Sequence, residues 1–168
     1  QGRIVRDGSF ADVRGAYLSM RPADVATHLA SRGMGIRIGA YGDGAALPID
    51  VLRDLTDGIY HTGYTHAWRT RADLAPLLMA SADTAQDQVD ASMAGWRTFR
   101  VRTATEALAP REIACPASEE AELIAGTRRT ACDSCGLCNG ARTDDRRANV
   151  AIIVHGIGTR SFLQMAVA

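Results

Sequence analysis

Short apolar runs alternate with stretches of helical periodicity along most of this 168-residue sequence, and this alternation constrains the fold more than any other feature. The runs predict strands over residues 35–41, 60–65, 77–80, 96–102, 112–115 and 150–154. The stretches between and before them predict helices over residues 10–18, 22–31, 49–56 and 84–93. Strands separated by helices favour parallel pairing. The sequence therefore predicts an α/β fold with a mainly parallel sheet of about six βα units, either a partial barrel or an open sheet.

The length and composition fit one domain. Apolar residues make up 46% of the chain, and a chain of 168 residues can bury a sizeable core. We therefore interpret residues 1–168 as a single α/β domain with a cysteine-rich, metal-binding loop inserted at residues 115–147. The sequence begins with Gln1 rather than Met and ends in an apolar tail, so we expect it to be truncated at one or both ends.

Charge and hydropathy exclude several classes of partner. The chain has 19 basic and 19 acidic residues, and a net charge of zero does not indicate a nucleic-acid partner. The sequence contains no apolar run of the roughly 20 residues needed to cross a bilayer, so we expect no membrane partner. Cysteines at metal-ligand spacing without a secretory signal favour a reducing compartment, and we expect a cytoplasmic protein.

The four cysteines form the pattern most closely tied to chemistry. Cys132, Cys135 and Cys138 have the spacing C-x2-C-x2-C, whereas Cys115 stands apart and is followed directly by Pro116. A close-spaced loop of three cysteines with a remote Cys-Pro is typical of ligands to a four-iron, four-sulfur cluster. The sequence therefore predicts that these four residues bind a 4Fe–4S cluster.

Zinc is the alternative metal. Structural zinc sites commonly take two pairs of close-spaced ligands, and this chain has one close-spaced group and a single remote cysteine. A zinc ion could still take all four sulfurs, or three sulfurs and a histidine such as His155. Free structural thiols are a third interpretation, and the spacing alone leaves the three open.

Polar residues follow the predicted strands at their carboxyl ends. In parallel α/β folds this edge of the sheet is where ligands bind and chemistry is done. Of these residues, His66, Arg102 and His155 are the candidate catalytic residues of a shared rim. The alternative is a purely structural role, because loops after strands are polar in any case. The strand-end residues are Asp43, His66, Ser81, Asp83, Arg102, Cys115 and His155.

Several segments together resemble a family of uncharacterised proteins encoded by bacteriophages and plasmids. The matching segments, in the same order, are residues 36–43, 62–68, 79–81, 95–102, 115–120 and 132–140. The resemblance implies a phage or plasmid origin, the cytoplasm of a bacterial host, and a longer protein with more cysteines upstream. It implies no activity. The family is distantly similar to radical S-adenosylmethionine enzymes, which have partial barrels, but their C-x3-C-x2-C loop is absent here.

Two functional hypotheses follow. In the first, the chain binds a 4Fe–4S cluster and is a redox or radical enzyme, or part of one. In the second, it is a zinc-stabilised, non-catalytic binding protein with a structural four-cysteine site that clamps the loop to the sheet. Neither a substrate nor a partner is indicated by the sequence.

Overall fold

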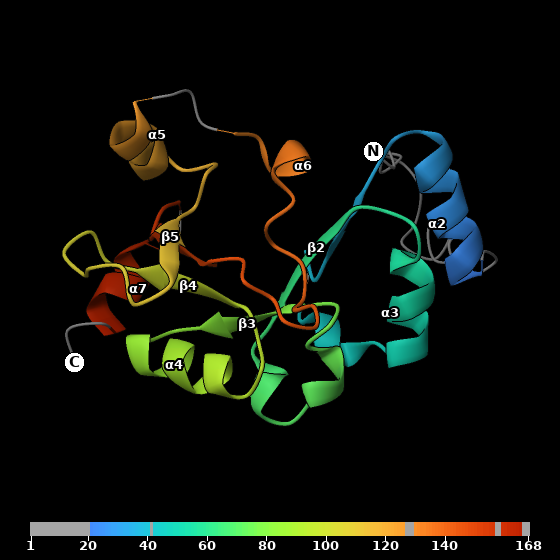
Figure 1. Ribbon diagram of the computed structural model, residues 1–168, viewed down its shortest axis with the longest axis horizontal. Coiled ribbons are helices and arrows are strands. Elements are labelled where there is room, and N and C mark those ends of the chain that lie inside the picture. Colours follow the sequence, from blue (N-terminus) through green and yellow to red (C-terminus); the bar gives the residue numbers. More distant parts are fainter. Residues whose placement is uncertain (1–20, 41, 127–129, 157–158, 166–168) are drawn as a thin grey trace.

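The computed structural model describes residues 21–40, 42–126, 130–156 and 159–165 (Figure 1). The helix expected at residues 10–18 lies outside the described residues, as does Tyr41 at the end of the first expected strand. All six expected strands form, and they pair in parallel in one sheet. Their bounds are β1 Ile36–Ile38, β2 His61–Thr65, β3 Met79–Ala82, β4 Thr98–Arg102, β5 Glu112–Ala114 and β6 Asn149–Ile153. The predicted α/β fold with a parallel sheet is confirmed.

The strand order is β1-β2-β3-β4-β6-β5, so the last strand of the chain is inserted between β4 and β5. This reversal leaves β1 and β5 at opposite edges of the sheet. The sheet is therefore open, which decides between the two architectures that the sequence allowed.

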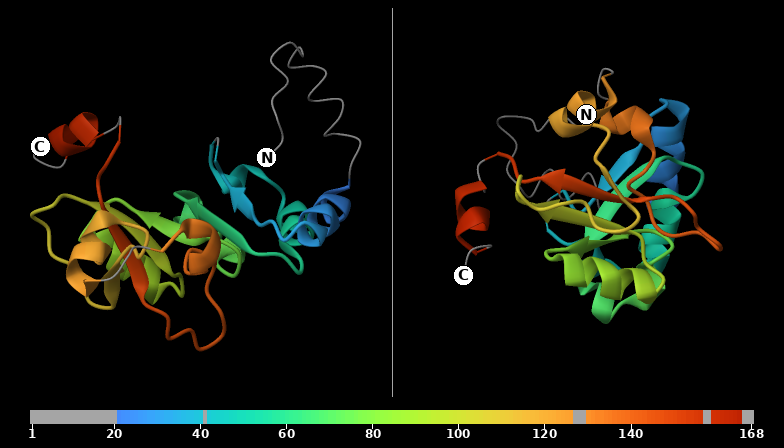
Figure 2. Two further views of the ribbon diagram at one scale, coloured as in Figure 1. Left: turned by 90° about the horizontal axis from the view of Figure 1, so that it is seen from above. Right: turned by 60° about the vertical axis from the view of Figure 1, so that its left-hand side comes forward.

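Helices cover the two faces of the sheet unequally. Figure 1 shows α4 (Ala85–Met93) below the sheet and α5 (Glu119–Ala125) and α6 (Cys132–Cys135) above it. Seen from above in Figure 2, α2 (Pro22–Ser31) and α3 (Ile49–Thr56) lie at the end of the sheet away from α5. A last helix, α7 (Thr159–Met165), follows β6. The short elements α5 and α6 thus lie over the face that the longer helix α4 leaves free.

Local sequence explains most of these bounds. The bounds of α2 and α3 match the prediction, and Thr84 and Asp87 cap α4 by a reciprocal capping box. Strand β3 begins two residues later than expected, because Leu77 and Leu78 donate backbone hydrogen bonds to Leu74 and continue a turn. The segment 119–147, expected as a loop, contains α5 and α6, each of which ends at a glycine in the left-handed region.

The core has one part on each face of the sheet, because successive strand residues point to opposite faces. In β3, Ala80 belongs to the larger part, with Leu52, Leu74 and Leu78, whereas Met79 belongs to the other. This second part is small and contains Met79, Val150 and Cys115, with Tyr64, Phe99, Ala117, Leu137, Cys138 and Ile152 packed against them. Two of the four cysteines are thus part of the core.

Candidate metal centre

The four cysteines line one cavity of about 660 Å³, although Cys115 is far from the others in sequence. Cys115 follows β5 directly, Cys132 and Cys135 are the first and last residues of α6, and Cys138 follows that helix. The wall formed by the sheet includes Arg37 from β1 and the residues Tyr60, Thr62 and Tyr64 in and beside β2.

Backbone hydrogen bonds fix Cys115 at the end of β5. Its N–H donates to the carbonyl oxygen of Ala151 in β6 at 2.7 Å, which extends the β5–β6 pairing by one residue. Its own carbonyl oxygen accepts from the backbone N–H of Ser118 at 2.8 Å and from the Ser118 hydroxyl at 2.7 Å. The same hydroxyl then caps α5. The remote cysteine is therefore held by the sheet.

The segment after α6 is bound along β2 and the turn before β3. Gly136 has φ 72° and turns the chain out of α6 toward Cys138. The N–H of Gly63 in β2 then donates to the carbonyl oxygen of Cys138 at 3.1 Å, and Ala141 donates to Ala75 at 2.7 Å. Gly140 lies so close to Pro76 that a Cβ atom would be 2.1 Å from its carbonyl carbon.

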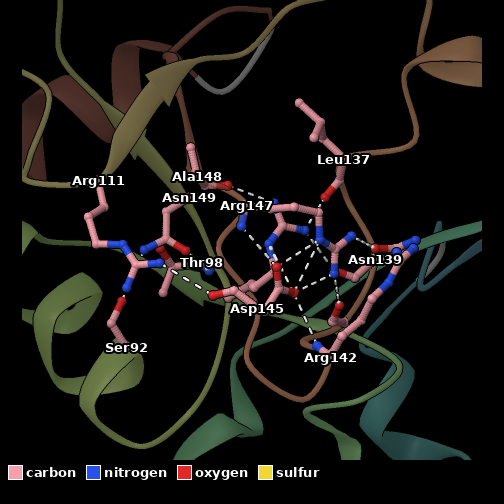
Figure 3. Close-up of polar contacts among 12 residues, drawn as sticks. Ser92, Thr98, Arg111, Leu137, Asn139, Arg142, Asp145, Arg147, Ala148 and Asn149 are labelled. Atoms are coloured by element: carbon pink, nitrogen blue, oxygen red, sulfur yellow. Dashed lines mark hydrogen bonds and ion pairs between the residues drawn. The ribbon is translucent and has the colours of Figure 1, made fainter.

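A buried arginine network holds the same segment from the other side. The side chain of Arg97, which is 4% exposed, donates from Nη1 to the carbonyl oxygens of Leu137 and Asn139, the latter at 3.0 Å, and from Nη2 to that of Ala148 at 2.7 Å. Asp145 lies 3.9 Å from Arg97 Nε and 2.5 Å from Arg147 Nη2. Figure 3 shows Leu137, Asn139, Arg147 and Ala148 gathered around Asp145.

The electrostatics of the cavity favour protonated thiols in the absence of metal. The pKa of Cys138 is raised to about 11, mainly by burial; the hydroxyl of Tyr64 and the charge of Arg97 lower it, and the nearby thiols of Cys115 and Cys135 raise it. Burial is also the main cause of the raised pKa of Cys115, with smaller contributions from Cys132 and Cys135. Because metals bind thiolates, metal binding must release these protons.

The four thiols line one cavity but are not gathered at one point. Among the described residues, no three His, Cys, Asp or Glu side chains are gathered closely enough to hold one metal ion. A zinc ion would need all four sulfurs at about 2.3 Å from one point. A 4Fe–4S cluster attaches each thiolate to a different corner and so holds the four sulfurs further apart. Four thiols around the wall of one cavity fit that arrangement.

Three of the strand-end residues meet at a second place. The N–H of His66 donates to Asp43 Oδ2 at 2.8 Å, and His66 Nε2 lies 3.3 Å from Asp83 Oδ1. Asp43 also accepts from the N–H of Ala45 and so caps the short 3-10 helix Gly44–Ala46. The side chains of His66 and Asp83 are both more than half exposed, so this is a surface arrangement. None of the three lines the cysteine cavity.

Arg102 and His155, the other two candidate catalytic residues, lie at or just after the ends of the neighbouring strands β4 and β6. Arg102 is buried and pairs with Glu120 of α5, while its Nη1 donates to the carbonyl oxygen of Glu106 at 2.5 Å. His155 is exposed after β6. The N–H of Val154 donates to the backbone carbonyl oxygen of Arg102 at 2.8 Å, so Arg102 and His155 lie at the ends of neighbouring strands. Across the described residues, no side-chain hydrogen bond or ion pair joins His66, Arg102 and His155 to one another.

The sequence did not predict that Arg97, Asp145 or the sheet residue Arg37 would lie in or around this site. Arginines flanking the cysteines were visible in the sequence, but Arg147 is engaged by Asp145. Arg97 precedes β4 by one residue and carried no local signal, because its acceptors are carbonyl oxygens some 40 residues away. The contact of Arg97 with the cysteine segment is therefore apparent only in the folded chain.

No protein-family model matches this chain, and neither does any curated protein or any solved structure. The resemblance to phage and plasmid proteins therefore stays a prediction. Within the described residues, no helix is long and apolar enough to cross a membrane.

Proposed function

We propose that this protein binds one 4Fe–4S cluster through Cys115, Cys132, Cys135 and Cys138 and works as a redox protein in the reducing cytoplasm of a bacterial cell. The observation that carries the proposal is the convergence of the remote Cys115 and the close-spaced cysteine loop on one cavity. When bound there, the cluster supplies one-electron transfer.

The chain's own residues would shield such a centre from water. Cys115 and Cys138 pack in the small core part with Met79 and Val150, and Leu137 packs beside them. Burial of this kind limits solvent access, and solvent access is one of the factors that set the reduction potential of a cluster. The small core part would thus shield the proposed centre on the side of Cys115 and Cys138, whereas Cys132 is exposed.

The cavity also supports an enzymatic role beside the cluster. Its volume of about 660 Å³ lies within the range of about 300–1,000 Å³ typical of cavities that bind small organic ligands. Arg37 and Thr62 are register partners on neighbouring strands and both line the cavity, so a substrate would meet a guanidinium and a hydroxyl group there. The nature of the substrate follows from neither group alone.

Zinc is the second candidate, and one observation favours it. The loop 130–149 is held largely by polar contacts, and of its apolar side chains Leu137 packs into the small core part. A bound metal ion would stabilise a loop that buries so little apolar surface, and this is the usual role of a zinc site with four cysteine ligands. In that case the protein is a non-catalytic binding protein.

Metal analysis of anaerobically purified protein distinguishes the candidates. We expect about four irons and four sulfides per chain and a broad visible absorption that bleaches on reduction. Replacing any one cysteine by alanine should reduce the iron content, whereas Ser134→Ala, between Cys132 and Cys135, should leave it unchanged. One zinc per chain and no colour would establish the alternative, and protein without bound metal would contradict both.

A further inference from the structure

We propose that Arg97 is a positioning residue for Cys138, an inference that rests on the proposed metal-binding function. Its guanidinium group donates to the carbonyl oxygens of Leu137 and Asn139, the residues on either side of Cys138. The carbonyl of Leu137 belongs to the peptide group that precedes Cys138, and the carbonyl of Asn139 belongs to the peptide group that follows Asn139. The peptide group between them is held by the bond from Gly63 to the carbonyl oxygen of Cys138. Arg97 and Gly63 together therefore fix the backbone on both sides of Cys138, and with it the direction of the Cα–Cβ bond that carries the sulfur.

The geometry of the network favours this specific role over general packing. The third bond of Arg97, to Ala148, ties the segment to the start of β6. Arg147 Nη2 donates to the carbonyl oxygen of Gly140 at 2.8 Å, and its Nη1 donates to the Asn139 side chain. Two guanidinium groups thus hold carbonyl oxygens at Leu137, Asn139 and Gly140. A lysine at position 97 could not form this fork, since an ammonium group is a point charge.

The network also places positive charge beside the sulfur. Arg97 and Arg147 share the single carboxylate of Asp145, so two positive charges face one negative charge in a largely buried site. Thiolate ligation makes a cluster negative, and reduction adds another negative charge. Arg97 interacts electrostatically with the Cys138 thiol, so this buried cation would stabilise a metal-bound thiolate and would favour the reduced form of a cluster.

Three variants distinguish an effect of Arg97 on the position of Cys138 from an effect of its positive charge. Arg97→Met removes both the donors and the charge but leaves Asp145 paired with Arg147. Arg97→Lys keeps the charge and loses the fork. Arg100→Lys is the matched control, because Arg100 lies three residues further along the chain in β4, is equally buried, and pairs with Glu112 and not with the cysteine segment.

The first readout uses metal-free protein and needs no cluster. The rates at which Cys138 and Cys132 react with a maleimide are measured by mass spectrometry. We expect Arg97→Lys, which keeps the positive charge, to raise the rate of Cys138 relative to Cys132, because the loosened segment exposes the sulfur. In Arg97→Met the loss of the nearby cation also lowers the thiolate fraction of Cys138, so its rate should rise less than in Arg97→Lys. Arg100→Lys should leave the ratio unchanged. An unchanged ratio in a folded Arg97→Lys variant would overturn the proposal, even if Arg97→Met fails to fold.

The second readout uses iron-loaded protein. We expect both Arg97 variants to lose iron to a chelator about tenfold faster than the wild type. The reduction potential should fall in Arg97→Met and stay closer to the wild-type value in Arg97→Lys. Equal potentials and equal iron loss in all proteins would overturn the proposal, as would the same change in Arg100→Lys. If the wild type binds no iron, the proposed function fails, and the alkylation ratio still decides the role of Arg97.

Discussion

The backbone N–H of Gly63 in β2 donates a hydrogen bond of 3.1 Å to the carbonyl oxygen of Cys138. Strand β3 pairs with β2 only from Tyr64 onward, so at Gly63 the cysteine segment occupies the side of β2 that β3 has not yet reached. One cysteine of the proposed centre is therefore attached to the sheet by a backbone hydrogen bond, of the kind that otherwise joins strand to strand.

Replacing Gly140 by alanine should detach this segment. A Cβ atom there would lie 2.1–2.3 Å from the backbone of Pro76 and Leu77, which cannot yield as a flexible side chain could. We expect Gly140→Ala to lower the free energy of unfolding by about 3 kcal/mol, the upper end for overpacking, and to reduce the metal content. Chemical denaturation and iron analysis test both effects.

The control for that variant is Gly95→Ala, after α4. Gly95 has φ 84° but open space around the position of a Cβ atom. The substitution should introduce only backbone strain there, which should lower the free energy of unfolding by about 1 kcal/mol and leave the metal content unchanged. Equal metal content in the two variants would contradict the claim that the close approach of Gly140 to Pro76 holds the cysteine segment in place.

Glu112→Gln should be among the most destabilising single changes in the sheet. Arg100 and Glu112 form a two-bond ion pair at 2.9 and 2.7 Å, and their side chains are 1% and 0% exposed. Neutralising one partner leaves the other charge buried without full compensation, which costs about 3–5 kcal/mol. Urea denaturation should show this loss.

Two further variants test the interpretation of that pair. Replacing both partners, as Arg100→Met with Glu112→Leu, should recover much of the loss, because no buried charge is then left unpaired. Asp73→Asn breaks the more exposed pair with Arg71 and should cost no more than about 1 kcal/mol. A similar loss for Asp73→Asn and Glu112→Gln would show that burial does not decide the energy of these pairs.

Metal-free Cys138 should react slowly with thiol reagents below its pKa of about 11. Its pKa is raised mainly by burial, so at a pH of about 8 only about one thiol in a thousand is the reactive thiolate. The rate of alkylation should rise about tenfold for each pH unit up to that pKa. Measured against the exposed Cys132 in the same sample, a rate for Cys138 that is independent of pH would contradict the raised pKa.

The fold was predictable because its signals are local. The apolar runs of β1 to β6, the proline at the start of α2 and the capping box of α4 each act within a few residues, and the alternation of elements then implies parallel pairing. The order β4-β6-β5 was not predictable, because it depends on which edge the last strand reaches. The sequence pattern of strands and helices would be the same if β5, and not β6, lay next to β4.

The grouping of the four cysteines was predictable from the sequence, whereas the residues around them were not; metal binding by the cysteines stays a prediction. Cysteine spacing identified the four residues that line the cavity. The rim inferred from strand ends stays a prediction; its Arg102 pairs with Glu120, and its Cys115 lines the cavity. Arg97 had no sequence signal, since its acceptors are backbone carbonyl groups, which every residue has.

Asp145 should make stability depend on acidic pH. Hydrogen bonds from Arg147 lower the pKa of its carboxyl well below its usual range, with further backbone donors from Arg147 and Arg142. Because the pKa is lower in the folded state than the unfolded value of about 3.9, its stabilising contribution is complete above that value. It is lost as the pH falls from there toward the folded-state pKa.

Asp145→Asn should therefore lower the free energy of unfolding at a pH of about 7, and the difference from the wild type should shrink as the pH falls below about 4. Asp144→Asn is the matched control, because Asp144 is exposed and has φ 55°, a conformation that asparagine adopts readily. Urea denaturation at several pH values measures all three proteins. A wild-type advantage over Asp145→Asn that stays constant into the acidic range would show that the carboxylate is not the titrating group, and that the contribution of position 145 comes from hydrogen-bond geometry, which an amide cannot reproduce at any pH.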